Sequence, residues 1–158
     1  MKKLFSLIGI IVVISSCQTE SKHDVLLHIT HSNKLDLRYM DGKCGEWGGN
    51  VQELIIYRDE FDSPLLADYS EKTKICGSYS ELKDSISIKR IKINEEESNL
   101  IIESINELCK SKMSREKVPP HGGISYHFML SDSSMIIRDS PSAELNNFAA
   151  LVVKIKQR

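Results

Sequence analysis

The strongest constraint on the fold is the alternation of side chains between Ile124 and Leu130. One phase contains Ile124, Tyr126, Phe128 and Leu130, and the other contains Ser125, His127 and Met129. Successive side chains of a β-strand point to opposite faces of a sheet, so this pattern predicts a strand with one buried face. The turn residues 131–133 connect it to a second expected strand, Ser134–Asp139, which completes a β-hairpin.

Five segments earlier in the chain also have the composition of strands. They are Val25–Thr30, Lys34–Met40, Val51–Arg58, Leu65–Tyr69 and Ser85–Ile93. The first two are separated only by His31-Ser32-Asn33 and are expected to form a hairpin. In the last segment the isoleucine phase slips by one residue between Ile88 and Ile91. This slip predicts a β-bulge or a strong twist around Lys89 and Arg90.

The segment that follows Asn94 has the signals of a helix N-terminus. The Asn94 side chain can cap the helix, Glu95–Glu97 place negative charge in the first turn, and Glu97 occupies the capping-box position. The helix is expected to extend to about Met113, before Pro119-Pro120. The side chains expected on its buried stripe are Ile101, Ile105, Leu108 and Cys109.

A second helix is predicted near the C-terminus, with Ser140 as its N-cap and Pro141 at its first helical position. The side chains expected to be buried on it are Leu145, Phe148, Ala149, Val152 and Ile155. Its last turn contains Lys154, Lys156 and Arg158, whose positive charge suits a helix C-terminus. Together these elements predict an α+β fold, mainly an antiparallel sheet with two helices packed on one face.

The first 16 residues have the layout of an export signal. Met1-Lys2-Lys3 is positively charged, and the segment Leu4–Ile14 is apolar except for Ser6 and Gly9. This run is too short to span the core of a bilayer, which requires about 20 apolar residues. We therefore expect a cleaved targeting segment and not a transmembrane anchor.

The tetrapeptide Ile14-Ser15-Ser16-Cys17 resembles the lipobox of bacterial lipoproteins, in which an aliphatic residue and two small residues precede a cysteine. The resemblance implies that Cys17 receives a diacylglyceryl group, is acylated on its amine, and becomes the mature N-terminus. An ordinary secreted protein is the alternative, but cleavage by the general signal peptidase would place bulky Ile14 where a small residue is expected.

The lipobox defines the expected organisation of the chain: a signal peptide over residues 1–16, a lipidated tether over 17–24, and a single α+β domain over 25–158. It implies a lipid-anchored protein of the cell envelope. Gln18 follows the cysteine where some bacteria place an aspartate that retains lipoproteins at the inner membrane. This difference favours the outer membrane, with the domain facing the periplasm or the cell surface.

The charge of the expected mature chain argues against a nucleic-acid partner. Cleavage after Ser16 would leave 142 residues with 19 basic and 22 acidic side chains, because Lys2 and Lys3 are removed. The mature chain would be mildly acidic, and its sequence contains no basic stripe or aromatic-rich basic cluster. The expected partners are the membrane, through the lipid on Cys17, and an envelope protein or glycan.

Three cysteines remain in the expected domain, in a compartment that favours disulfides. Cys109 lies on the apolar stripe of a predicted helix, which indicates a buried thiol. Cys44 and Cys76 each precede a glycine in a loop, so they are the expected disulfide pair. Two free thiols at these positions are the alternative, because spacing alone does not decide a pairing.

The loop from Cys44 to Asn50 contains the single tryptophan of the chain and is the candidate binding surface. Trp47, with Gly48 and Gly49 beside it, could stack on a sugar or anchor a protein partner. Glu46 could accept a hydrogen bond from the same ligand. The alternative is that Trp47 packs against the sheet and the glycines serve only turns, since a lone tryptophan more often belongs to a core.

The sequence offers little evidence for catalysis, a metal or a cofactor. His28 and His31 would not share one face of a strand, which argues against a metal half-site. The nucleophile elbow, the zinc-protease motif and the phosphate-binding glycine loop are all missing from the sequence. The leading hypothesis is a non-catalytic binding module. The alternative is a thiol-dependent or hydrolytic enzyme that uses Cys44 or Cys76 with His121 as base.

Overall fold

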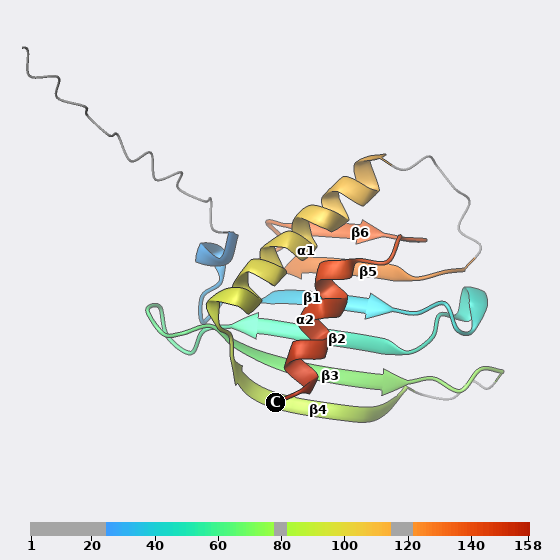
Figure 1. The fold of residues 1–158 in the computed structure, drawn as a ribbon, viewed down its shortest axis with the longest axis horizontal. Helices are drawn as coiled ribbons and strands as arrows, with labels where there is room; N and C mark the ends of the chain where they lie inside the picture. Colours follow the sequence, from blue (N-terminus) through green and yellow to red (C-terminus); the bar gives the residue numbers. More distant parts are fainter. Residues whose placement is uncertain (1–24, 78–81, 115–121) are drawn as a thin grey trace, which may run out of the picture.

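A computed structural model describes residues 25–77, 82–114 and 122–158. The described residues form a six-stranded antiparallel sheet in the order β4-β3-β2-β1-β5-β6 (Figure 1). The strands are β1 (Leu35–Met40), β2 (Val51–Tyr57), β3 (Leu66–Thr73), β4 (Lys83–Lys92), β5 (Ser125–Leu130) and β6 (Ile136–Asp139). The predicted strands after Thr30 therefore all form, and β3 extends four residues beyond the expected Tyr69 because it pairs with both β2 and β4.

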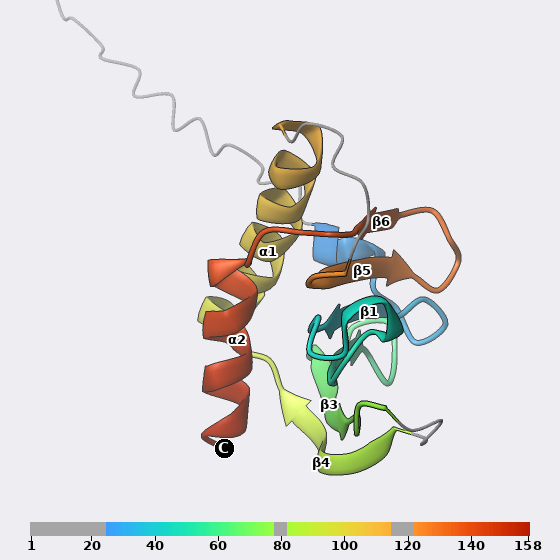
Figure 2. The same cartoon turned by 90° about the vertical axis from the view of Figure 1, so that its right-hand side faces the viewer.

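Two helices, α1 (Glu95–Ser114) and α2 (Asn146–Lys156), cover one face of the sheet (Figures 1 and 2). The core lies between the two layers. Its fully buried side chains include Leu37, Leu54, Tyr69 and Phe128 from the strands and Ile101, Leu108, Phe148 and Leu151 from the helices. The predicted α+β class, with two helices on one face of an antiparallel sheet, is confirmed.

Two local predictions hold at the junction of β4 and α1. Tyr69 pairs with Ile88 and Ala67 pairs with Ile91, so two residues of β4 oppose only Asp68 on β3, which is the expected bulge. The capping box is also present, because the Glu97 amide donates to the Asn94 side chain at 2.8 Å and the Glu97 carboxylate accepts from the Asn94 amide at 2.9 Å.

The first predicted strand is wrong. Residues Val25–His28 form a 3₁₀ helix, η1, and so the expected hairpin with β1 does not exist. Leu26 and Ile29 are both buried while Leu27 is 73% exposed, which is the spacing of a helical turn and not the alternation of a strand. β1 instead lies in the middle of the sheet, between β2 and β5.

The predicted start of the last helix is also wrong. Helix α2 begins at Asn146 and not at Pro141. Its first amides are capped from another element, because the Glu107 carboxylate of α1 accepts from the backbone amides of Asn146 and Asn147 at 3.0 and 3.1 Å. A cap supplied by a residue almost forty positions away leaves no local signal in the sequence.

The sheet has two ends with different loops. The entry end, where the described chain begins, contains residues 25–34, 58–65 and 131–135. The disulfide end contains residues 41–50, 74–77 and 122–124. Because the strands are antiparallel, the β1–β2 loop lies at the opposite end of the sheet from the β2–β3 turn (Figure 1).

Candidate functional site at the disulfide end

The loop between β1 and β2 is closed by Asp41 and Asn50, which face each other across its base. One Asp41 carboxylate oxygen accepts from the Asn50 amide at 2.9 Å and from the Lys43 amide at 3.1 Å. The other oxygen accepts from the Asn50 side chain at 2.9 Å. The Asn50 side-chain carbonyl in turn accepts from the Lys74 amide at 3.0 Å, which joins the loop to the end of β3.

Gly48 and Gly49, both expected to belong to the binding surface, allow the chain to fold tightly on this base. A Cβ at Gly49 would lie 1.7 Å from the Asp41 carboxylate oxygen, so no larger residue fits while that hydrogen-bonded carboxylate stays in place. Gly48 has a φ of 72°, and a Cβ there would lie 2.7 Å from the Met40 sulfur. Gly48 and Gly49 therefore shape the loop, and nothing in their geometry gives them direct contact with a ligand.

Cys44 and Cys76 form a disulfide, with their Cα atoms 5.3 Å apart. The bond ties the β1–β2 loop to the segment that follows β3. The Lys74 ammonium adds a second link between these segments by donating to the Trp47 carbonyl. The expected pairing is thus present, and Cys109 is a half-buried free cysteine packed against the core.

Trp47 is displayed on the surface of this cross-linked loop. It is the last residue of a short 3₁₀ turn, η2 (Gly45–Trp47), and its side chain is 76% exposed. Glu46 beside it is also exposed. Ile75, which precedes the bonded Cys76, is 58% exposed. The alternative that Trp47 packs against the sheet is therefore wrong, and the disulfide end presents an aromatic and an aliphatic side chain to solvent.

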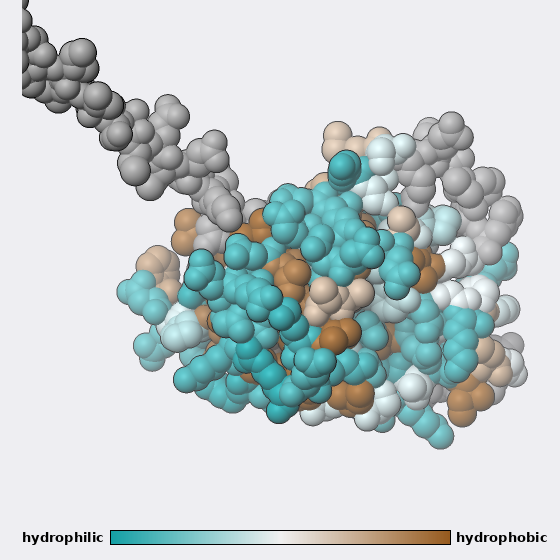
Figure 3. Space-filling model, in the orientation of Figure 1, coloured by the Kyte–Doolittle hydropathy of each residue, from teal (hydrophilic) through white to brown (hydrophobic). Residues whose placement is uncertain are grey.

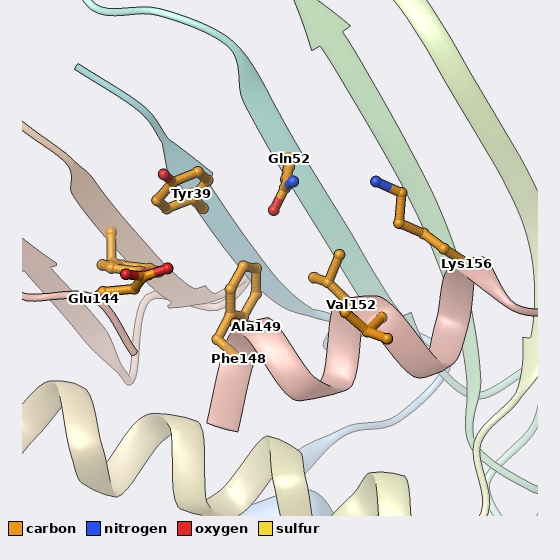
Figure 4. A pocket seen from close by; sticks show the side chains of 9 residues that line it. Tyr39, Gln52, Glu144, Phe148, Ala149, Val152 and Lys156 are labelled. Atoms are coloured by element: carbon orange, nitrogen blue, oxygen red, sulfur yellow. The ribbon is translucent and has the colours of Figure 1, made fainter. Parts of the chain in front are cut away.

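A second candidate is a cleft of about 240 Å³ between α2 and the sheet (Figure 4). It is lined by Tyr39, Gln52, Tyr126, Glu144, Phe148, Ala149, Val152, Val153 and Lys156. The Glu71 carboxylate binds two residues of this lining: it accepts a hydrogen bond from Lys156 at 2.5 Å and one from Gln52 at 3.2 Å. Burial acts to raise the pKa of Glu71, but the hydrogen bonds from Lys156 and Tyr69 lower it overall. Gln52 and Lys156, two polar residues of the lining, are thus both bonded to Glu71.

A third candidate lies on the face of the sheet that the helices leave uncovered. Asp36 is on this face, between its cross-strand neighbours Ile55 and Met129. One of its carboxylate oxygens is buried and has no hydrogen-bond partner among the described residues. Burial, and secondarily the charge of Glu53, raises the pKa of Asp36 to about 6. A single such carboxyl group carries no evident chemistry, but it affects stability.

Among the described residues, no histidine is hydrogen-bonded to the disulfide loop. His28 and His31 belong to the entry end, and His121 lies outside the described residues. His127 accepts a hydrogen bond from Arg138 at 3.0 Å, and its pKa is lowered by burial and by the charges of Arg138 and Arg38. Within the described ranges, no three His, Cys, Asp or Glu side chains gather as a metal site would require.

Sequence reasoning missed two parts of this site. The Asp41–Asn50 base had a weak signal, since both residues flank the glycine-rich segment and short polar side chains often close turns. Ile75 had no such signal, because its segment is joined to the Trp47 loop by the pairing of Cys44 with Cys76 across 32 residues.

No family model, no curated protein sequence and no solved structure matches the chain. Among the helices within residues 25–77, 82–114 and 122–158, none has the length and apolar character needed to cross a membrane.

Proposed function

We propose that this chain is an exported lipoprotein, held at the cell envelope by lipid on Cys17, whose domain is a non-catalytic binding module. The observation that carries the binding role is the 76% exposure of Trp47 on a loop fixed by a disulfide. The lipobox resemblance of Ile14-Ser15-Ser16-Cys17 supports the anchor. The outer membrane is the proposed location, with the domain facing the periplasm or the surface.

The order of the loop supports recognition. Binding a partner costs conformational entropy when a mobile segment must be fixed, and a loop already fixed by covalent and hydrogen bonds avoids most of that cost. Tryptophan is also among the side chains that most often dominate binding energy at interfaces. The proposed contact surface is Trp47 with Ile75, and Glu46 at its edge. Its proposed partner is an envelope protein or glycan.

The disulfide argues against the enzymatic alternative. A thiolate is the nucleophile in cysteine chemistry, and neither Cys44 nor Cys76 has a free thiol in the disulfide. An enzyme that used either residue with His121 would have to be reduced first. Alkylation of the unreduced protein at Cys44 or Cys76 would revive this alternative, and resistance of both to alkylation would exclude it.

The test of the binding role compares three forms of the full chain: the wild type, Trp47→Ala and Met113→Ala. Each form is expressed in bacteria and purified from the cell envelope together with the material that it binds. Trp47→Ala should reduce recovery of the specific partner by roughly 30-fold, the effect of losing about 2 kcal/mol at an interface hot spot. Met113→Ala is the matched control, because Met113 is 87% exposed but belongs to the end of α1. Equal recovery with all three forms would remove Trp47 from the binding surface.

A further inference from the structure

The entry end of the domain also exposes large apolar side chains. Phe61, in the turn between β2 and β3, is 75% exposed, and Leu27 in η1 is 73% exposed. Leu27 is directed outward because its neighbours Leu26 and Ile29 are buried in the core. The helix-covered face, coloured by hydropathy, has apolar residues at this left-hand end of the molecule (Figure 3). Single exposed apolar side chains are common on protein surfaces, so what matters is how these two are held and where the chain before them leads.

Arg58 connects the two segments that expose Leu27 and Phe61. Its side chain donates from Nε to the Ile29 carbonyl at 3.1 Å and from a terminal nitrogen to the Ser63 carbonyl at 2.5 Å. The β2–β3 turn is closed in addition by the Ser63 hydroxyl, which accepts from the Glu60 amide at 3.0 Å. Leu27 and Phe61 are thus presented by one hydrogen-bonded unit and not by two independent loops.

The chain outside the described residues places this unit near a membrane, provided that the proposed lipid anchor on Cys17 exists. Only eight peptide units separate Cys17 from Val25, where the described chain begins. Eight fully extended residues span at most about 29 Å. Val25, at the entry end, therefore stays within that distance of the lipid-bearing residue, whatever conformation those residues adopt. The six-residue strand β1, about 20 Å long, separates the disulfide end from the entry end.

We infer that the entry end docks on the bilayer that holds the lipid of Cys17, with Leu27 and Phe61 in the interface and Trp47 directed away from it. The occupant is a lipid surface because the short link keeps one within reach of these two side chains. Insertion is shallow, on the order of the 5–10 Å boundary between headgroups and acyl chains. Glu60 and Asp62 flank Phe61, so docking does not depend on anionic lipid.

The single native tryptophan makes the orientation measurable. The full lipidated chain is reconstituted into vesicles of phosphatidylcholine and phosphatidylethanolamine, with or without brominated acyl chains, which quench tryptophan emission at short range. Native Trp47 is one probe. Phe61→Trp and Leu27→Trp, each combined with Trp47→Phe, are the entry-end probes. Met113→Trp with Trp47→Phe is the matched control for an exposed apolar site elsewhere. All four positions are exposed, and circular dichroism checks that each variant keeps the fold.

Brominated lipid should reduce the emission of the Phe61→Trp and Leu27→Trp probes by about twofold or more, as expected for a ring at the acyl boundary. Emission from Trp47 and from the Met113→Trp control should remain unchanged. Replacement of a third of the phosphatidylcholine by phosphatidylglycerol should not increase the quenching.

Three results would overturn the inference. Entry-end probes that are unquenched in a chain shown to carry palmitate would refute docking and leave the lipoprotein proposal intact. Equal quenching of Trp47 and the entry-end probes would refute the orientation. A chain that takes up no palmitate would refute the lipid anchor itself, and docking would be rejected with it.

Discussion

Both ends of the sheet expose apolar side chains, but different interactions hold the loops of the two ends in place. The disulfide end is fixed by the Cys44–Cys76 bond and by the Asp41–Asn50 hydrogen bonds at the base of its loop. The entry end has no disulfide and is held by side chains that bond to the backbone, such as Arg58 to Ile29. Exposure alone therefore does not distinguish a partner surface from a membrane surface.

The position of the anchor distinguishes them in our account. The seven residues between Cys17 and Val25 would keep the start of the described chain near the proposed lipid, and the antiparallel strands place the disulfide end at the opposite end of the sheet. A partner approaching through the periplasm or the medium would meet Trp47 first. The covalent cross-link lies at the end that would have to keep its shape without support from the membrane.

Loss of the shared core should have the largest effect and should affect both ends equally. Phe128 is fully buried in β5 and its ring lies 5.8 Å from that of Phe148 in α2. Phe128→Ala and Phe148→Ala should each lower the free energy of unfolding by about 3–5 kcal/mol, the usual cost of such cavities. Chemical denaturation measures this loss. A change below about 1 kcal/mol at either site would contradict the packing of these two rings in the core between the sheet and α2.

Removal of the disulfide should have a smaller effect on stability, and its effect on local opening should begin at one end. The bond closes a segment of 32 residues, and its loss should lower stability by roughly 3–4 kcal/mol in the chain-entropy model. The double variant Cys44→Ser, Cys76→Ser can be compared with Cys109→Ser, which removes a thiol outside the disulfide. Hydrogen exchange should accelerate at residues 41–50 and 74–77 first. Equal acceleration at residues 58–65 would contradict the separation of the two ends.

The pH dependence of stability should report on Asp36, which lies in the half of β1 nearer the entry end. Its pKa is raised from 3.8 to about 6 in the fold. The unfolded chain therefore ionises first, so stability is fully present below pH about 4 and is lost as the pH rises through about 6. After allowance for its partial exposure, we expect Asp36→Asn to stabilise the protein by about 1 kcal/mol at pH 7.

Thermal melts of Asp36→Asn at pH 4 and pH 7 test this assignment. The gain should be absent at pH 4, where the native carboxyl group is already protonated. A variant with the same gain at both values would show that the effect comes from packing and not from ionisation.

The smallest effects on stability should come from the exposed apolar residues at the two ends. Trp47→Ala and Phe61→Ala should each change the free energy of unfolding by less than about 0.5 kcal/mol, as is usual for surface sites. Their functional effects should differ, because only Trp47→Ala should weaken partner recovery. A Trp47→Ala protein that unfolds would make its loop part of the core.

The sequence predicted the fold well wherever local patterns and tertiary packing agreed. The alternation in Ile124–Leu130, the phase slip at Lys89-Arg90 and the Asn94–Glu97 capping box each match the structure, because each depends on neighbours in the chain. The segment Val25–Thr30 failed because its pattern also suits a helical turn. The start of α2 failed because Glu107 supplies the cap from another helix.

The candidate site was predictable only in part. The glycines around Trp47 and the pairing of Cys44 with Cys76 were expected from the residues themselves. The exposure of Trp47 was not, because the same loop sequence is compatible with a tryptophan folded onto the sheet. The surface formed by Leu27 and Phe61 has no local signal, since it depends on the Arg58 side chain bridging two distant segments.

We assign the entry end to the membrane and the disulfide end to a partner because we propose that Cys17 carries the lipid anchor. Labelling of growing cells with palmitate tests it directly in the full chain, with Cys109→Ser as the matched cysteine control. We predict that the wild-type chain and Cys109→Ser incorporate label, whereas Cys17→Ser incorporates none and remains a longer precursor or is released. Normal labelling of Cys17→Ser, or no labelling of the wild-type chain, would contradict the account.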